Sequence, residues 1–160
     1  MKEINRVMAC IDMSDYSEMT VEHALAIVRG LQSEVLLVNV INSRDIEYLN
    51  TASEHYSGKF DVEKYIERVK AERYQAIQEM IEKQVDADKA KMRILIDVGI
   101  PIDAILKAIE TEEVDLVVIA SKGRSNLLGT LFGSNAERVF RHSPVPVLSI
   151  RSRERFSRNR

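Results

Sequence analysis

Short apolar runs and longer amphipathic segments alternate along the whole chain. The apolar runs are rich in β-branched residues, which predicts buried strands, and the longer segments carry apolar residues at helical spacing, which predicts helices. Strands are predicted over residues 6–11, 34–41, 92–98, 114–120 and 144–150. Helices are predicted from Ser17, as N-cap, to near Gly30, and over residues 62–85, 102–111 and 133–142.

Strands that alternate with helices in this way are typical of α/β proteins. We therefore expect a five-stranded parallel sheet with helices on both faces and right-handed crossovers. Pro144 and Pro146 restrict the last strand to an edge or terminal position. The length fits one domain over residues 1–151, followed by an arginine-rich tail over residues 152–160 that we expect to be solvated.

One segment does not follow the alternation. Residues 42–58 lack a clear apolar period and are rich in serine, asparagine and threonine. This pattern predicts a long, mobile connection between the second strand and the second predicted helix.

The composition narrows the class of protein. A net charge of −2 gives no general attraction to nucleic acid or to anionic membranes. No apolar stretch approaches the roughly 18 to 20 residues of a membrane span, and the N-terminus has no signal-peptide core, so we expect a cytoplasmic protein. Cys10, the single cysteine, lies in an apolar run and is expected to be a buried, unreactive thiol.

The strongest functional pattern is the segment from Ala120 to Ser134, which carries Gly123 and Gly133 between a predicted strand and a predicted helix. Backbone N–H groups and the positive end of a helix dipole favour phosphate in such loops. Two other strand ends, Asp12–Ser17 and Asn39–Asn42, lie at the same edge of the predicted sheet. The three loops predict a ligand crevice where the strand order reverses.

These residues resemble the universal stress protein family over nearly the whole chain. The likeness rests on the strand end Ile11-Asp12, on Val98-Gly99-Ile100-Pro101, on Ser121-Lys122-Gly123 through Gly133-Ser134, and on Pro144-Val145-Pro146-Val147-Leu148. Nucleotide-binding members carry Gly-x-x-Gly-x9-Gly-Ser/Thr, and this chain keeps the register but has Ala120 in place of the first glycine. Alanine is a mild change unless the backbone there needs a positive φ.

The resemblance implies a flavodoxin-like or adenine-nucleotide α-hydrolase-like sheet with strand order 3-2-1-4-5, and ATP as ligand, with Mg²⁺ as a further expectation. It places Asp12 and Val40 near adenine or ribose, and Gly123, Gly133 and Ser134 at the phosphates. The rest of the expected binding set is Ile119, Ala120, Arg124 and Asn135. We expect no catalytic residues and no protein metal ligand.

Several of these residues have a structural alternative. Gly133 and Ser134 would also suit a simple helix N-terminus, with the serine as cap. Asp12 would also cap the turn that follows it. Arg124 would also suit a solvated loop tip.

The resemblance also implies a homodimer. The predicted edge strand Val145 to Ile150 is apolar, and antiparallel pairing with a second copy would cover it. The alternative is that the C-terminal tail shields this strand.

We therefore expect an ATP-binding regulator or sensor of the stress response, whose downstream protein partner is unknown. Slow hydrolysis, or autophosphorylation at Ser121 or Ser125, would be a secondary activity. One alternative is a dimeric interaction module without nucleotide, which Ala120 favours. The other is an adenylating enzyme, although the phosphate motifs of that class are missing.

Overall fold

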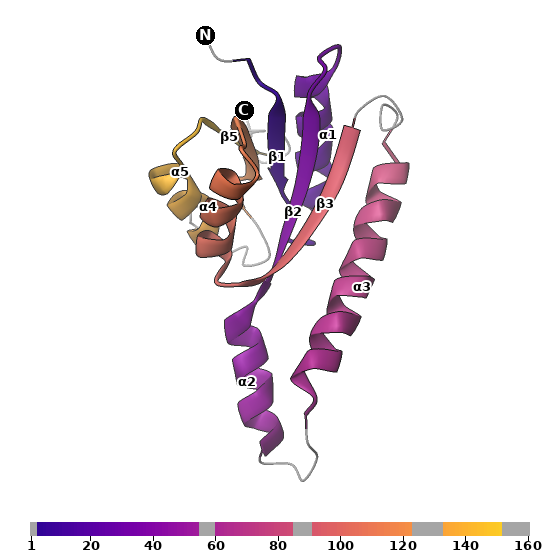
Figure 1. The fold of residues 1–160 in the computed structure, drawn as a ribbon, viewed down its shortest axis with the longest axis vertical. Helices are drawn as coiled ribbons and strands as arrows, with labels where there is room; N and C mark the ends of the chain where they lie inside the picture. The colour runs from indigo at the N-terminus through magenta and orange to yellow at the C-terminus, as the bar shows by residue number, and fades with distance from the viewer. Residues whose placement is uncertain (1–2, 55–59, 85–90, 123–132, 152–160) are drawn as a thin grey trace, which may run out of the picture.

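The computed structural model describes residues 3–54, 60–84, 91–122 and 133–151 (Figure 1). The elements follow in the order β1 (Arg6–Cys10), α1 (Ser17–Val28), β2 (Glu34–Asn42), α2 (Ser43–Glu54), α3 (Val62–Glu82), β3 (Lys91–Gly99), α4 (Pro101–Thr111), β4 (Leu116–Ala120), α5 (Ser134–His142) and β5 (Val147–Ile150). The five strands form one parallel sheet in the order β3-β2-β1-β4-β5, which confirms the predicted fold.

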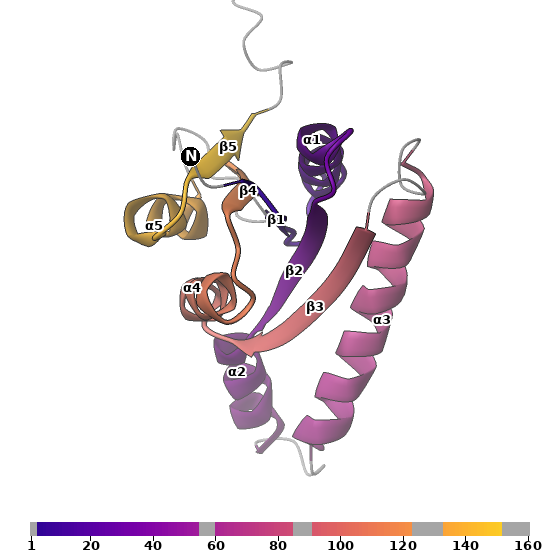
Figure 2. The same ribbon diagram turned by 45° about the horizontal axis from the view of Figure 1, so that its top comes forward.

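The sheet has a helical layer on each face (Figure 2). Because successive strand residues point to opposite faces, Val7 and Ala9 pack with α1 and α3, whereas Met8 packs with α4 and α5. Both sides of the central strands are therefore buried, which explains why their sequences are nearly continuous apolar runs.

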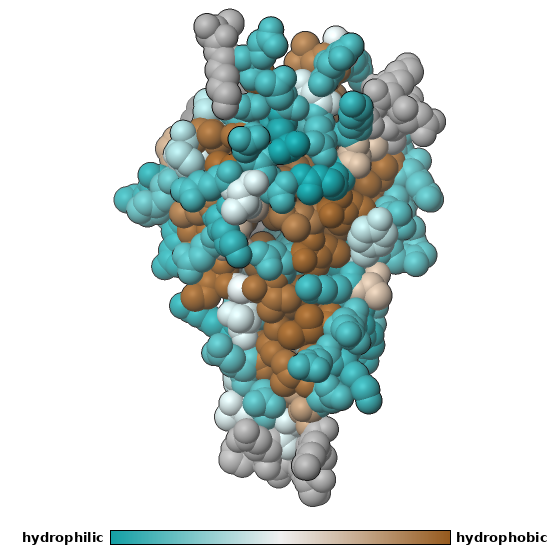
Figure 3. Space-filling model, in the orientation of Figure 1, coloured by the Kyte–Doolittle hydropathy of each residue, from teal (hydrophilic) through white to brown (hydrophobic). Residues whose placement is uncertain are grey.

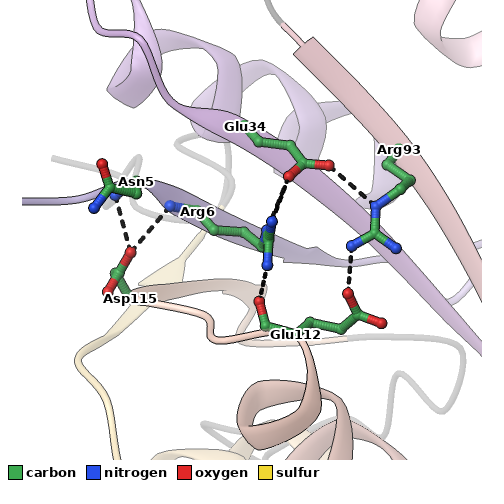
Figure 4. A network of polar contacts seen from close by, with 6 residues as sticks. All are labelled: Asn5, Arg6, Glu34, Arg93, Glu112 and Asp115. Atoms are coloured by element: carbon green, nitrogen blue, oxygen red, sulfur yellow. Dashed lines mark hydrogen bonds and ion pairs between the residues drawn. The ribbon is translucent and has the colours of Figure 1, made fainter.

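A network of charged side chains joins the amino ends of the strands (Figure 4). Glu34 at the start of β2 receives hydrogen bonds from Arg6 Nε at 2.9 Å and from Arg93 Nε at 3.1 Å. Arg93 also pairs with Glu112, and Arg6 donates to the Glu112 carbonyl. Burial alone would raise the pKa of Glu34, but the hydrogen bonds and charges of Arg93 and Arg6 hold it below its usual value.

The prediction of a mobile connection over residues 42–58 was wrong where the structure describes it. Residues 43–54 form α2, which extends beyond the end of the sheet (Figure 1). Asn42 accepts the Arg44 N–H at 3.2 Å, the bond that an N-cap side chain makes, and Ile46 is only 6% exposed. The helix is otherwise polar and buries little, so its apolar period was too weak to detect.

The prediction of Ser17 as N-cap was also wrong. Tyr16 occupies the N-cap position of α1 without a side-chain capping bond, and Ser17 is the first helical residue. The helix ends at Val28, before Gly30, whose φ of +77° suits glycine. Other element ends differ from the predictions by a few residues, as expected where caps and pairing partners decide them.

An apolar band runs along the edge strand β3 and down between α2 and α3 (Figure 3). It includes a shallow groove of about 510 Å³ between Tyr74 on α3 and Ile94 and Ile96 on β3. Among the described residues, none of the helices combines the length and the apolar character that crossing a bilayer requires.

Candidate functional site

A cavity of about 400 Å³ lies at the carboxyl ends of the strands, within the size range of small-molecule sites. Segments from β1, β2, β4, α2, α3, α4 and α5 contribute to it. Its lining consists of Cys10, Ile11, Asp12, Val38, Val40, Asn42, Asp45, Arg73, Pro101, Ile105, Ile119, Ala120, Lys122, Gly133, Ser134, Asn135 and Ala136.

The turn after β1 forms one wall. Ile11 N–H donates to the Val38 carbonyl at 2.9 Å, and the chain then turns through Met13, whose φ of 63° is in the left-handed region. Asp12 Oδ1 accepts hydrogen bonds from Ser14 N–H at 3.1 Å and from Ser14 Oγ at 2.6 Å. Asp12 therefore stabilises this turn and also lines the cavity.

The end of β2 and the start of α2 form the second wall. Val40 contributes an apolar side chain that packs with the α4 and α5 side of the core. Asn42 and Asp45 follow it at the rim, on the helix that the sequence did not reveal. This wall thus combines an apolar surface with carboxylate and amide groups.

The third wall is the end of β4 together with the N-terminus of α5. Gly133 is the N-cap of α5, and its N–H donates to the Ser121 carbonyl at 2.7 Å. Ser121 N–H in turn donates to the Ile150 carbonyl of β5 at 2.9 Å. These bonds hold the first turn of α5 beside the end of β4, and its positive dipole end lies at the cavity.

Ala120 has an ordinary strand conformation. Among the described residues, Met13 and Glu113 are the only non-glycine positions with positive φ, and Ala120 is the last residue of β4. The backbone at this position therefore does not require glycine.

Charge is distributed unevenly around the cavity. Asp12, Asp45 and the cation Arg73 lie on the β1, β2 and α2 side, whereas Lys122 lies with the N-terminus of α5. At the base of the cavity, burial, with a smaller contribution from the charge of Asp12, raises the pKa of the Cys10 thiol to about 12. The thiol is therefore protonated at neutral pH, as expected for an unreactive cysteine.

Most of the predicted binding residues lie in this one cavity: Asp12, Val40, Ile119, Ala120, Gly133, Ser134 and Asn135. Gly123 and Arg124 lie outside the described residues. What each of these residues binds stays a prediction.

Sequence reasoning missed two contributors in particular. Asp45 belongs to α2, where a connection was predicted, and Arg73 lies on α3 four residues after Val69 and four before Ile77, within the stripe that faces the sheet. Its spacing was the available signal, because Arg73 falls in register with the inward-facing residues of α3 whereas the other charged residues of this helix are exposed. Within the described part of the chain, no three His, Cys, Asp or Glu side chains gather as a metal site requires.

Comparison with known proteins identifies the family that shares this fold. The model of the universal stress protein family matches residues 3–151. Universal stress protein MJ0577 of Methanocaldococcus jannaschii is 29% identical over 158 residues, which cover 91% of this chain and 94% of that relative. A solved structure of MJ0577 has a TM-score of 0.78 at 27% identity, over 93% of this chain and 96% of that chain.

Two solved structures of relatives are described as nucleotide complexes. A universal stress protein in complex with cAMP has a TM-score of 0.65 at 21% identity, over 93% of this chain and 98% of that chain. The universal stress protein of Archaeoglobus fulgidus in complex with dAMP has a TM-score of 0.56 at 20% identity, over 94% and 100%. At these identities the likeness establishes the shared fold. Since the family match spans nearly all of the described sheet and helices, this chain belongs to the universal stress protein family.

Proposed function

We propose that the protein binds an adenine nucleotide, namely ATP, in the cavity at the strand ends and acts as a regulator or sensor in the stress response. The observation that carries the proposal is the composition of the cavity. The glycine-led N-terminus of α5 lies on one side, and an apolar wall with acidic and amide groups lies on the other. The first suits phosphates and the second suits a nucleoside.

Gly133 supports the phosphate assignment. Its φ of −69° and ψ of 149° are open to any residue, so the backbone conformation does not require glycine there. Because glycine has no side chain, an anion in the cavity could approach the N–H groups of this helix N-terminus closely. Glycine is also an acceptable N-cap, so a substitution is needed to separate the two roles.

The charges favour one orientation of the nucleotide. The carboxylates of Asp12 and Asp45 would repel phosphates from the β1 and α2 side, although Arg73 offsets part of their charge. Lys122 and the dipole of α5 would attract phosphates to the other side. The base and ribose would then lie between Asp12 and Val40, where the carboxylate can accept hydrogen bonds from ribose hydroxyls.

The relatives add chemical support. The ligands named for two of them, cAMP and dAMP, both contain adenine. The assignment of a triphosphate with Mg²⁺ is supported by the loop motif from Ala120 to Ser134. The ordinary backbone conformation of Ala120 is compatible with that motif.

Three further properties belong to the proposal. The protein acts in the cytoplasm, and it forms a homodimer through β5, the last strand of the described sheet, on which Leu148 is 39% exposed. Any hydrolysis or autophosphorylation is slow. Ser121 is only 4% exposed, so its hydroxyl would have to become accessible before it could accept a phosphoryl group.

A direct test is to denature the purified protein, analyse the released small molecules by chromatography, and measure the thermal shift on adding ATP and Mg²⁺. We expect an adenine nucleotide in the released material, or a higher melting temperature with ATP, because ligand that binds only the folded state stabilises it. The absence of both a released nucleotide and a thermal shift would contradict the proposal and favour a dimeric interaction module.

A further inference from the structure

A series of hydrogen bonds joins β1 to β2 beyond the last residue pair of their ladder, and it includes a side chain from α3. The register of these strands ends at Cys10 and Val38, where β1 stops and its chain turns toward α1. One residue further on, Asn39 Nδ2 donates to the Ile11 carbonyl at 2.8 Å. Asn39 is 1% exposed, so its amide requires partners inside the protein.

Arg73 supplies the other partner of this amide. Its Nη1 donates to Asn39 Oδ1 at 2.6 Å and to the Val40 carbonyl at 3.0 Å. The guanidinium therefore bridges a buried side chain and the backbone of the residue that forms the apolar wall of the cavity. Arg73 itself lines the cavity, although it originates on the helix that covers the opposite face of the sheet.

These contacts connect the two walls of the nucleoside side. Arg73 holds Asn39 and Val40 on β2, and Asn39 holds Ile11, which precedes Asp12. If the arginine donors were removed, a buried amide oxygen and a backbone carbonyl would lose a charge-assisted bond. The amide of Asn39 could then reorient, and the separation between Asp12 and Val40 would no longer be fixed.

We propose that Arg73 is a positioning residue that sets the spacing of the Asp12 and Val40 walls and so determines affinity for the nucleoside part of the ligand. This inference rests on the proposed nucleotide function. It assigns to α3 a role in binding that is separate from the phosphate contacts at α5. Because the effect acts on the nucleoside side, it should be the same with or without phosphates.

The test compares Arg73→Met with the wild-type protein by calorimetry with adenosine and with ATP. We expect both dissociation constants to rise by the same factor, about tenfold, because walls that Arg73 no longer holds must be ordered when the nucleoside binds. Arg73→Lys keeps a donor and should recover part of both affinities. Arg68→Met is the matched control, because Arg68 is an exposed residue on the same helix that pairs with Glu72 at 3.7 Å, and it should change neither constant.

Amide hydrogen exchange without ligand gives a second readout. Exchange at Ile11 and Ser14, whose N–H groups bond to Val38 and Asp12, should be faster in Arg73→Met than in the wild type.

Unchanged affinities for both ligands, or a loss confined to ATP, would overturn the inference, the latter by making Arg73 a phosphate contact. If the wild type binds neither ligand, the proposed function fails. In that case exchange decides the positioning role, since faster exchange supports it and unchanged exchange refutes it.

Discussion

Gly133 and Ala120 show how single positions bear on the binding function. Neither has a backbone conformation that demands glycine. The alanine that departs from the nucleotide-binding motif is therefore tolerated by the strand, while the glycine at the helix N-terminus is free to serve close approach of a ligand.

At this scale we predict that Gly133→Val abolishes ATP binding and leaves the protein folded. A β-branched side chain at the N-cap costs roughly 1 kcal/mol of helix stability, which a domain of this size withstands, but it blocks the N–H groups of α5. Calorimetry measures the affinity and circular dichroism the fold. Gly99→Ala is the control, because its Cβ would meet Ala104 Cβ at an ordinary 3.9 Å outside the cavity. Unchanged ATP affinity in Gly133→Val would mean that the phosphates bind elsewhere.

Among the elements, the buried strands were easier to predict from the sequence than α2, the helix that follows the end of β2. Strands buried on both faces show long apolar runs, so β2 and β4 could be recognised directly. The helix α2 could not, because Ile46 is the only residue of its described side chains that is fully buried. The N-cap at Asn42 was the available signal, and asparagine is equally common in loops.

The network at the amino ends of the strands predicts an acid-sensitive stability. The pKa of Glu34 is held below its ordinary value of 4.5, so its stabilising contribution is present above that pH and is lost as the pH falls through the lowered value. We expect Glu34→Gln to lower the free energy of unfolding by about 1 kcal/mol at pH 7, measured by urea denaturation.

The difference between Glu34→Gln and the wild type should shrink as the solution is acidified below the ordinary pKa of the carboxyl. Glu137→Gln is the control, since Glu137 forms an exposed pair with Arg141 and should cost less than about 0.5 kcal/mol. A pH-independent difference would show that the charge of Glu34 is not what stabilises the strand ends.

For the whole molecule, the alternation of strands and helices predicted the parallel sheet and a cavity at its carboxyl edge, while the strand order came from the family resemblance. The chain could not reveal that α3 reaches the cavity. The helical spacing of Arg73 with Val69 and Ile77 indicates that it faces the protein, but its partners Asn39 and Val40 are met only after α3 has packed on the sheet.

The proposed dimer is testable at the open edge of β5. The carbonyl of Pro146 accepts a hydrogen bond from Val117 of β4 and that of Ile150 from Ser121, just after β4. By alternation the N–H of Ser149 points away from β4. Ser149→Pro should therefore remove a donor from the open edge without breaking the sheet, and convert a dimer of twice 18.3 kDa into a monomer. Light scattering after gel filtration measures the mass.

Ser149→Ala keeps the N–H and removes only a hydroxyl that has no hydrogen-bond partner among the residues that the structure describes, so it should remain dimeric. A monomeric wild type, or a Ser149→Pro variant that is still dimeric, would contradict dimerisation through this strand.

The most direct test of the nucleotide site is a crystal structure of the protein grown with ATP and Mg²⁺. We predict that the base lies against Val40, the ribose near Asp12, and the phosphates at the N–H groups of Ser134 and Asn135, since the Gly133 N–H is bonded to the Ser121 carbonyl. Nucleotide bound at another surface, or a cavity without nucleotide at saturating ATP, would contradict the account.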